Sequence, residues 1–128
     1  MDDGLLLHVL EGGSVPGPLR ATLRVAAHHA LLAGHFPGAP LVPGVLLLEA
    51  TVLAFGRSLG RTANLVAVDE ARWFAPVAPG VEVALAAMVQ ATADGVSIQG
   101  EWQAEGRRVA SFTVQVAKGV EPGVPARP

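Results

Sequence analysis

Two side chains of this 128-residue chain have types and spacing suited to acid–base chemistry. His35 precedes a Phe-Pro-Gly turn, and Glu49 follows fourteen positions later within an apolar run. Imidazole and carboxyl groups are common general acids and bases in enzymes. The apolar residues around Glu49 predict that it is buried, which would favour its protonated form. A structural carboxylate, paired with an arginine or capped by backbone groups, is the other interpretation of Glu49, and His35 alone could be structural or solvated.

The remaining candidates for chemistry are weaker. His8, His28 and His29 stand outside any motif, and the adjacent pair would point to opposite faces of a strand, so no metal site is expected there. The chain has no cysteine, which excludes disulfides, thiolate nucleophiles and cysteine-based metal sites. No nucleotide or flavin motif is present, and the sequence therefore predicts neither a metal nor a cofactor.

The two candidate residues lie on either side of a helix start. Residues 34–44 (GHFPGAPLVPG) hold three prolines and three glycines, which predicts an irregular loop. Residues 45–59 follow as a helix, with Pro43-Gly44 at its start and Gly60 as its stop. Apolar residues on nearly every face of this helix indicate that it is buried.

Strands are expected on both sides of the helix. Before it, residues 5–10 and 20–27 form two short candidates separated by a loop over residues 12–18. After it, apolar and polar residues alternate through 81–89, 96–103 and 110–116, with hairpin turns at Asp94-Gly95 and Glu105-Gly106. We expect about four antiparallel strands there, and a sheet that wraps around the single helix.

Composition limits the class of protein. Hydrophobic residues make up 51% of the chain and charged residues 16%, which predicts one domain over residues 1–118, followed by a flexible tail over 119–128. The net charge of -2 argues against a nucleic-acid partner. Residues 25–48 carry no Asp, Glu, Lys or Arg, but three prolines make a membrane span improbable, so a cytoplasmic protein is expected. The mean hydropathy of +0.44 suggests that part of the surface is buried against another copy.

Two segments together resemble one enzyme family. Residues 34–50 (GHFPGAPLVPGVLLLEA) are similar to the active-site segment of the 3-hydroxyacyl-acyl carrier protein (ACP) dehydratases, including the fourteen-residue spacing from histidine to acid. Residues 69–80 (DEARWFAPVAPG) resemble the strand that follows the helix in that family, where a basic-aromatic pair leads to Pro-Val-x-Pro-Gly. The two motifs occur in the right order and at the right separation, and the resemblance extends over roughly residues 20–117. Within that family, the chain most resembles the small dehydratases of specialised pathways.

This resemblance implies a fold and a reaction. The fold would be an α+β hotdog fold, in which a curved antiparallel sheet wraps around one long central helix, paired as a homodimer or a multiple of it. The enzyme would be a hydro-lyase that removes water from a 3-hydroxyacyl thioester carried by ACP, giving a trans-2-enoyl thioester. His35 would act as base and Glu49 as acid, from different subunits. No metal or cofactor is implied.

The resemblance also suggests residues around the reacting pair. The free N–H groups at the helix start, at Gly44 and Val45, would face the thioester oxygen, and Gly44 would let a ligand approach the backbone closely. Leu46 and Phe74 would line the acyl tunnel, together with Val45. Arg72 would contact the acidic carrier, with help from one of two arginine pairs, at 57 and 61 or at 107 and 108.

Two departures from the family's pattern bear on the carrier contact and the substrate, and two other functions stay open. The family usually has a glutamine one turn after the acid, where this chain has Leu53, and of the family's basic cluster near the second motif only Arg72 remains. A hotdog thioesterase would use a similar helix carboxylate to activate water, although such enzymes generally lack the His-Phe-Pro-Gly turn. A non-catalytic, dehydratase-like partner that binds an acyl chain is the other alternative, which the missing glutamine would support.

Overall fold

The computed structural model describes residues 5–26 and 42–117. His28, His29, His35 and the expected tail over 119–128 lie outside the described residues. Within the described part no helix has the length and apolarity needed to cross a bilayer.

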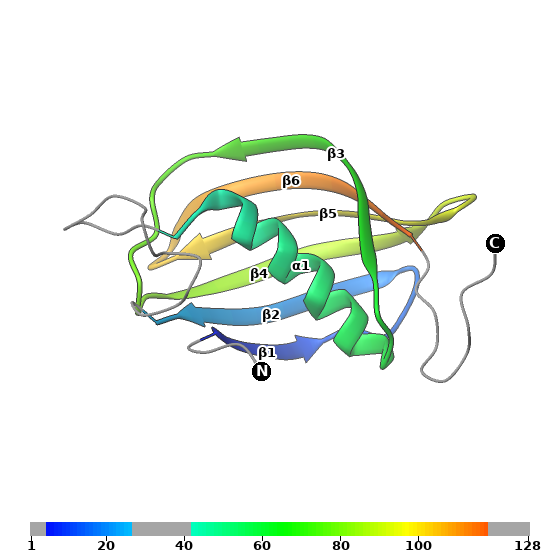
Figure 1. Ribbon diagram of the computed structural model, residues 1–128, viewed down its shortest axis with the longest axis horizontal. Coiled ribbons are helices and arrows are strands. Elements are labelled where there is room, and N and C mark those ends of the chain that lie inside the picture. Colours follow the sequence, from blue (N-terminus) through cyan, green and yellow to red (C-terminus); the bar gives the residue numbers. More distant parts are fainter. Residues whose placement is uncertain (1–4, 27–41, 118–128) are drawn as a thin grey trace.

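One helix and six strands make up the described chain (Figure 1). In chain order they are β1 (Leu5–Glu11), β2 (Gly17–Val25), α1 (Gly44–Leu59), β3 (Asn64–Trp73), β4 (Glu82–Ala91), β5 (Gly95–Ala104) and β6 (Arg107–Ala117). The expected order of one or two strands, one helix and about four strands is therefore confirmed. Strand β2 begins earlier than expected because Gly17 and Pro18 already pair with Val89 and Met88 of β4.

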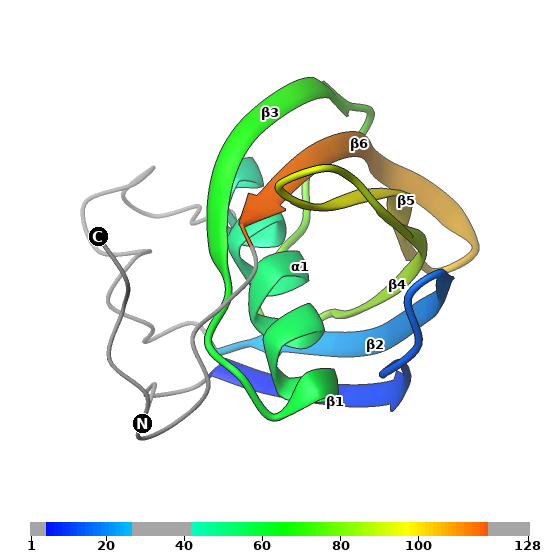
Figure 2. The same ribbon diagram turned by 90° about the vertical axis from the view of Figure 1, so that its right-hand side faces the viewer.

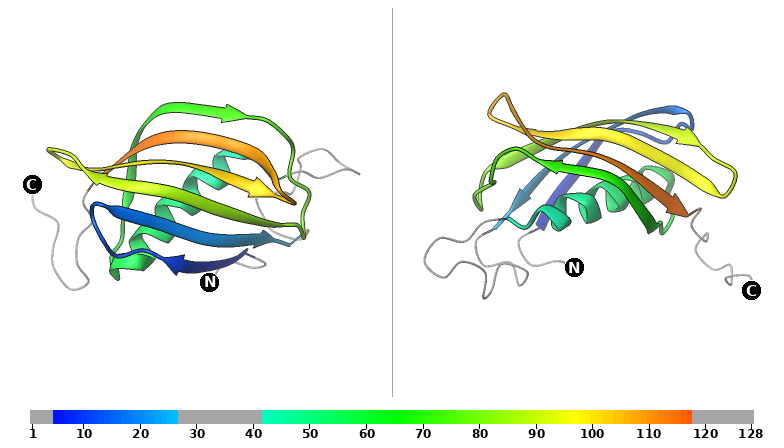
Figure 3. Two further views of the ribbon diagram at one scale, coloured as in Figure 1. Left: turned by 180° about the vertical axis from the view of Figure 1, so that it is seen from behind. Right: turned by 90° about the horizontal axis from the view of Figure 1, so that it is seen from above.

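The strands form a single antiparallel sheet in the order β1-β2-β4-β5-β6-β3. The sheet curves around α1, which lies against its concave face (Figures 2 and 3). The predicted alternation is confirmed, since apolar side chains of the last three strands point toward the helix and are buried, among them Leu85, Ile98, Trp102, Phe112 and Val114. The predicted turn at Glu105-Gly106 is also confirmed, with positive φ angles at both residues.

The ends of α1 follow the sequence signals. Pro43 is the N-cap, and the helix begins at Gly44 rather than Val45. Gly60 adopts the left-handed conformation after the last turn, where its N–H donates to Arg57 O and that of Arg61 donates to Gly56 O. These two bonds satisfy carbonyls at the helix end and reverse the chain toward β3.

The expectation that α1 is buried on every side is wrong for the single chain. The sheet covers only one side of the helix, and a stripe on the other side is solvent-exposed. Val45 is 57% exposed and Leu53 36%, and Glu49, which lies between them one turn from each, is exposed too. Residues four apart share a helix face, so these three side chains form one outward stripe.

A buried hydrogen bond fixes which face of α1 points inward. Thr51 is the buried polar residue of the described core; its hydroxyl donates to Leu47 O at 2.8 Å and accepts from Trp102 Nε1 at 3.0 Å. The Trp102 side chain is fully buried on β5. Because Thr51 is two positions after Glu49, roughly 200° around the helix, holding Thr51 inward turns Glu49 outward.

We expect Thr51→Val to lower the free energy of unfolding by about 1–3 kcal/mol, because it keeps the side-chain shape but leaves the buried Trp102 N–H without an acceptor. The measurement is urea unfolding at one fixed protein concentration. In a Trp102→Phe background, where no indole N–H needs an acceptor, the same change should cost far less. Equal costs in the two backgrounds would show that this hydrogen bond does not hold the helix.

Candidate functional site

A pocket of about 610 Å³ surrounds the first turn of α1; we call it the helix-start pocket. Its walls come from the start of α1, from the segment that follows β3, and from β6. The lining residues are Val42, Pro43, Gly44, Val45, Leu47, Trp73, Phe74, Ala75, Pro76, Val77 and Val109. The two sequence motifs therefore meet in space, because the later part of the first and the middle of the second both line this pocket.

The start of α1 offers a positive dipole end to this pocket. Pro43 makes no side-chain cap hydrogen bond, and the first turn contains no acidic residue. The first N–H groups of a helix have no partner within the helix, and the dipole there favours negative charge. Gly44 and Val45, the two residues expected to face a thioester oxygen, both line the pocket.

The role expected for Gly44 needs a correction. The indole of Trp73 packs on it so closely that a Cβ added at Gly44 would lie 2.9 Å from ring atoms. The small residue is therefore required by an aromatic side chain of the protein itself, and Trp73 covers this part of the backbone. Trp73 is 50% exposed, so it forms a wall of the pocket as well as a cover of the helix start.

Of the residues expected to line an acyl tunnel, two line the helix-start pocket and one does not. Phe74 and Val45 line the helix-start pocket and are both solvent-exposed. Leu46 does not line it: this side chain is only 4% exposed, because it points from α1 toward the sheet and belongs to the core. Leu47, the next residue, lines the pocket instead.

Hydrogen bonds anchor the second motif to both ends of the segment that carries His35. The N–H of Val42 donates to Val77 O at 2.8 Å, just before α1. The N–H of Gly80 donates to Val25 O at 2.8 Å, at the end of β2, and Arg24 donates to the Gly80 carbonyl. The chain therefore leaves β2 and enters α1 beside the same short stretch of backbone, and Val42 and Val77 both line the pocket. His35 itself lies outside the described residues.

Glu49 is not in the wall of this pocket. It lies one helical turn after Val45, on the outward stripe, about 6 Å further along the helix axis. Its exposure in the single chain contradicts the expectation of a buried carboxyl group. No hydrogen bond or ion pair within the described residues engages this carboxylate.

The arginines expected to contact the carrier lie toward opposite ends of α1. Arg72, on β3, pairs with Glu70 of the same strand at 3.1 Å and does not line the pocket. Arg108 lies with its guanidinium carbon 4.5 Å from the centre of the Phe74 ring, so it stands at the pocket rim. Arg57 is at the other end of α1, where it donates to Leu7 O. Of the two candidate pairs, the one at 107 and 108 is near the pocket.

An exposed apolar surface adjoins the outward stripe of α1. Strand β3 is an edge strand that contacts α1, and its apolar side chains Leu65, Val66, Val68 and Trp73 are solvent-exposed. Val66 reaches 65% exposure. A long apolar edge strand is a common site of association, because its free backbone groups can pair with another strand. We call β3 and the stripe of Val45, Glu49 and Leu53 the open face.

Sequence reasoning missed the role of Trp73 at the pocket, and it named Arg108 as a possible carrier contact without foreseeing its contact with Phe74. Trp73 was visible only as the neighbour of Arg72, although its packing on the Pro-Gly helix start links the two motifs. Arg108 reaches Phe74 because Phe74 N–H donates to Val109 O, a long-range pairing that local patterns do not encode. Across residues 5–26 and 42–117, no group of three His, Cys, Asp or Glu could hold a metal ion.

Comparison with known sequences places the chain among dehydratases. A family model described as "ApeI dehydratase" matches residues 16–120. The 3-hydroxyacyl-[acyl-carrier-protein] dehydratase FabZ of Cronobacter sakazakii is 34% identical over 113 residues, which cover 80% of this chain and 75% of that protein. FabZ of Escherichia coli is 33% identical over an alignment of the same length.

Comparison with solved structures confirms the hotdog fold. The dehydratase heterocomplex ApeI:P from Xenorhabdus doucetiae matches with a TM-score of 0.67 and 14% identity, over 86% of this chain and 96% of that one. A hypothetical thioesterase with coenzyme A from Streptococcus pneumoniae matches with a TM-score of 0.62 and 11% identity, over 91% and 88% of the chains. At these identities the similarity speaks for the fold, which dehydratases and thioesterases share.

Proposed function

The chain belongs to the ApeI-like dehydratase family, and from this premise we propose that it removes water from a 3-hydroxyacyl thioester on an acyl carrier protein. The product is a trans-2-enoyl thioester, and the enzyme is a hydro-lyase. The observation that carries the proposal is the meeting of the two family motifs around the start of α1, which has no side-chain cap.

In this reaction His35 acts as the base. It takes a proton from C2 of the acyl chain, next to the thioester carbonyl. Negative charge then develops on the thioester oxygen, and this charge is stabilised by the first N–H groups and the dipole of α1, at Gly44 and Val45. The helix-start pocket supports this role, because its floor is a helix start without a side-chain cap.

Glu49 acts as the acid. As the electrons of the C2–H bond form the new C2–C3 double bond, the C3–O bond breaks, and the carboxyl group gives its proton to the departing hydroxyl, which leaves as water. The proton taken by His35 must return to Glu49 through solvent before the next turnover. His35 thus acts at C2, and Glu49 acts on the hydroxyl group at C3.

We place the complete site between two subunits. Glu49 is on the open face, outside the helix-start pocket of its own chain. A second copy that covers this face would enclose Glu49 between Val45 and Leu53 and would remove the exposed side chains of β3 from water. The position of Glu49 outside the helix-start pocket of its own chain supports the assignment of His35 and Glu49 to different subunits, and the proposed partner is a second copy of this chain.

A thioesterase would share the fold and the helix carboxylate, but it would release a thiol. The family match and the FabZ relatives favour elimination of water. Leu53, in place of a glutamine, leaves the face around Glu49 without an amide to orient the carboxylate. The proposed site therefore depends on the partner subunit to position this group.

For catalysis, we expect the purified chain to hydrate a 2-enoyl pantetheine thioester, the reverse of the proposed reaction, without releasing thiol. His35→Ala and Glu49→Gln should each lower turnover roughly a hundredfold or more, as loss of a general acid or base does. The measurement is the loss of enoyl-thioester absorbance, with a thiol assay in parallel. Glu11→Gln, at an exposed carboxylate on β1, is the matched control and should keep full activity.

Wild-type turnover in either site variant, with the fold intact by circular dichroism, would contradict the two-residue mechanism. Release of thiol without hydration would favour the thioesterase. If the wild-type chain binds the thioester but neither hydrates it nor releases thiol, a non-catalytic partner subunit would be favoured.

The carrier would dock at the rim of the helix-start pocket. Arg72 is exposed on β3, and Arg108 stacks on Phe74 in the pocket wall. Both can face an acidic carrier without being buried, whereas Arg57 is about 20 Å away along α1. The net charge of -2 provides no general attraction, so we assign a weak contact to Arg72 with help from Arg108.

We expect Arg72→Ala, and more strongly the double change with Arg108→Ala, to raise KM severalfold for a carrier-bound substrate, because the rim charges that attract the acidic carrier are lost. KM for the short pantetheine substrate should stay unchanged. Arg20→Ala, at an exposed position on β2 outside the pocket, controls for the loss of one charge. Equal effects on the two substrates would mean that these arginines serve the fold or the pocket, not the carrier.

A further inference from the structure

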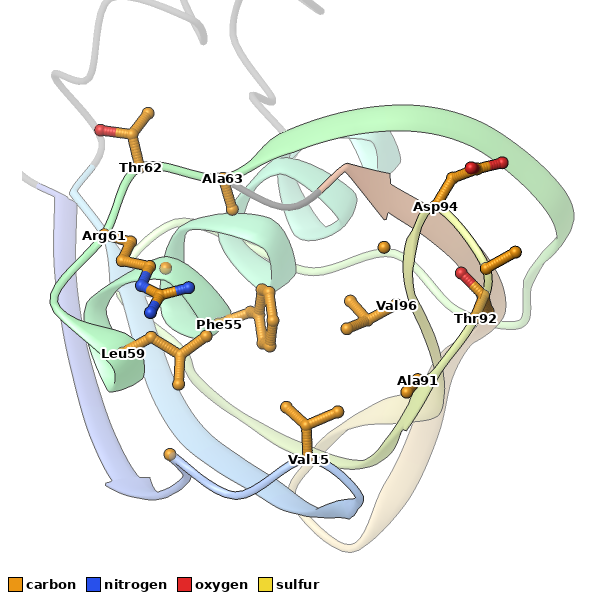
Figure 4. A pocket seen from close by; sticks show the side chains of 14 residues that line it. Val15, Phe55, Leu59, Arg61, Thr62, Ala63, Ala91, Thr92, Asp94 and Val96 are labelled. Carbon is orange, nitrogen blue, oxygen red and sulfur yellow. The ribbon is translucent and has the colours of Figure 1, made fainter. Parts of the chain in front are cut away.

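A second cavity lies at the opposite end of α1. Its volume is about 480 Å³, and we call it the helix-end pocket. It opens between the last turns of α1, the β1–β2 connection and the β4–β5 hairpin (Figure 4). None of its lining residues lines the helix-start pocket, and the two are separated by most of the length of α1, about 20 Å.

Apolar side chains form the body of this cavity. Phe55 and Val96 are buried in the core and provide the floor. Val15, Leu59 and Ala63 surround it from the β1–β2 connection and the end of α1, as Figure 4 shows. The size falls within the usual range for small-molecule sites, which are mostly apolar with a few oriented polar groups.

One cation is built into the rim by the end of the helix. The 2.9 Å bond from Arg61 N–H to Gly56 O folds the chain back over the last turn. Gly56 has no room for a side chain, since a Cβ there would lie 2.5 Å from Arg61 O. This close approach holds the Arg61 backbone at the cavity mouth, and Figure 4 shows the guanidinium turned toward Phe55 and Leu59.

The two charged side chains at the rim of the helix-end pocket point in different directions. Asp94, on the β4–β5 hairpin, lines the pocket, but its carboxylate points away from the cavity in Figure 4. Arg61 already makes an interaction within the protein, and the five N–H donors of a guanidinium can serve more than one acceptor. The cavity therefore offers an apolar body and one inward-facing cation.

We propose that the helix-end pocket binds an amphipathic carboxylate, with its aliphatic body against Phe55 and Val96 and its carboxylate on Arg61. This site is separate from the proposed reaction site, and it does not require the dehydratase function. A free fatty acid and a thioester-bound acyl chain share the aliphatic body, but only the free acid carries the carboxylate that Arg61 recognises.

The test uses sodium octanoate and the full chain labelled with ¹³C in its Ala, Val and Leu methyl groups. We expect saturable shifts of the methyl signals of Val15, Leu59 and Val96, and none at Val45 and Val109 in the other pocket. Octanol and octanoyl pantetheine, which lack the carboxylate, should bind roughly tenfold more weakly. Arg61→Gln should weaken octanoate to the level of octanol, while Arg20→Gln, with the same loss of charge, should not.

A second variant keeps the test independent of Arg61. Ala63 points into the cavity in Figure 4, so Ala63→Phe should fill it and abolish the shifts without removing a charge. Shifts confined to Val45 and Val109, equal binding of octanol and octanoate, or unchanged binding in Ala63→Phe would each overturn the proposal. Hydration activity measured on the same samples is a separate result, so failure here and failure of the dehydratase proposal are distinguishable.

Discussion

The hydrogen bond from Trp102 to Thr51 sets the rotation of α1 against the sheet, and the rest of the molecule depends on that rotation. With Thr51 held inward, Leu46, Ala50 and Phe55 enter the core, and Val45, Glu49 and Leu53 point outward. A helix rotated by half a turn would bury an unpaired carboxylate, at a cost of several kcal/mol. The same constraint presents Glu49 on the open face, where a second copy of the chain could enclose it.

At each end of α1, a glycine leaves room for another part of the chain to pack closely against the helix. At the start, Gly44 accommodates the indole of Trp73, which joins the two motifs into one pocket. At the end, Gly56 accommodates the backbone of Arg61, which brings a cation to the second cavity. The helix thus separates two pockets of different character: one has backbone donors and a rim of aromatic and arginine side chains, and the other has an apolar body and one cation.

The order of elements could be predicted from the sequence because it depends on local patterns: alternation in β4–β6, Pro43 before the helix and Gly60 after it. The burial of Glu49 was mispredicted because some apolar residues of α1 pack on the sheet while others, beside Glu49, are exposed in the single chain. Local patterns cannot tell an apolar side chain that packs on its own sheet, such as Leu46, from one that stays exposed in the single chain, such as Val45. The contacts of Trp73 with Gly44 and of Arg108 with Phe74 depend on strand pairing, which joins residues far apart in the chain.

The central claim is that each reaction site takes His35 from one subunit and Glu49 from the other. The most direct measurement mixes two inactive variants, His35→Ala and Glu49→Ala, by co-expression with different tags and isolation of the doubly tagged dimer. The account predicts that this mixed dimer regains about half of the wild-type activity per dimer, because one of its two symmetric sites contains both intact residues. A doubly tagged dimer that forms but stays as inactive as its parents would contradict the account.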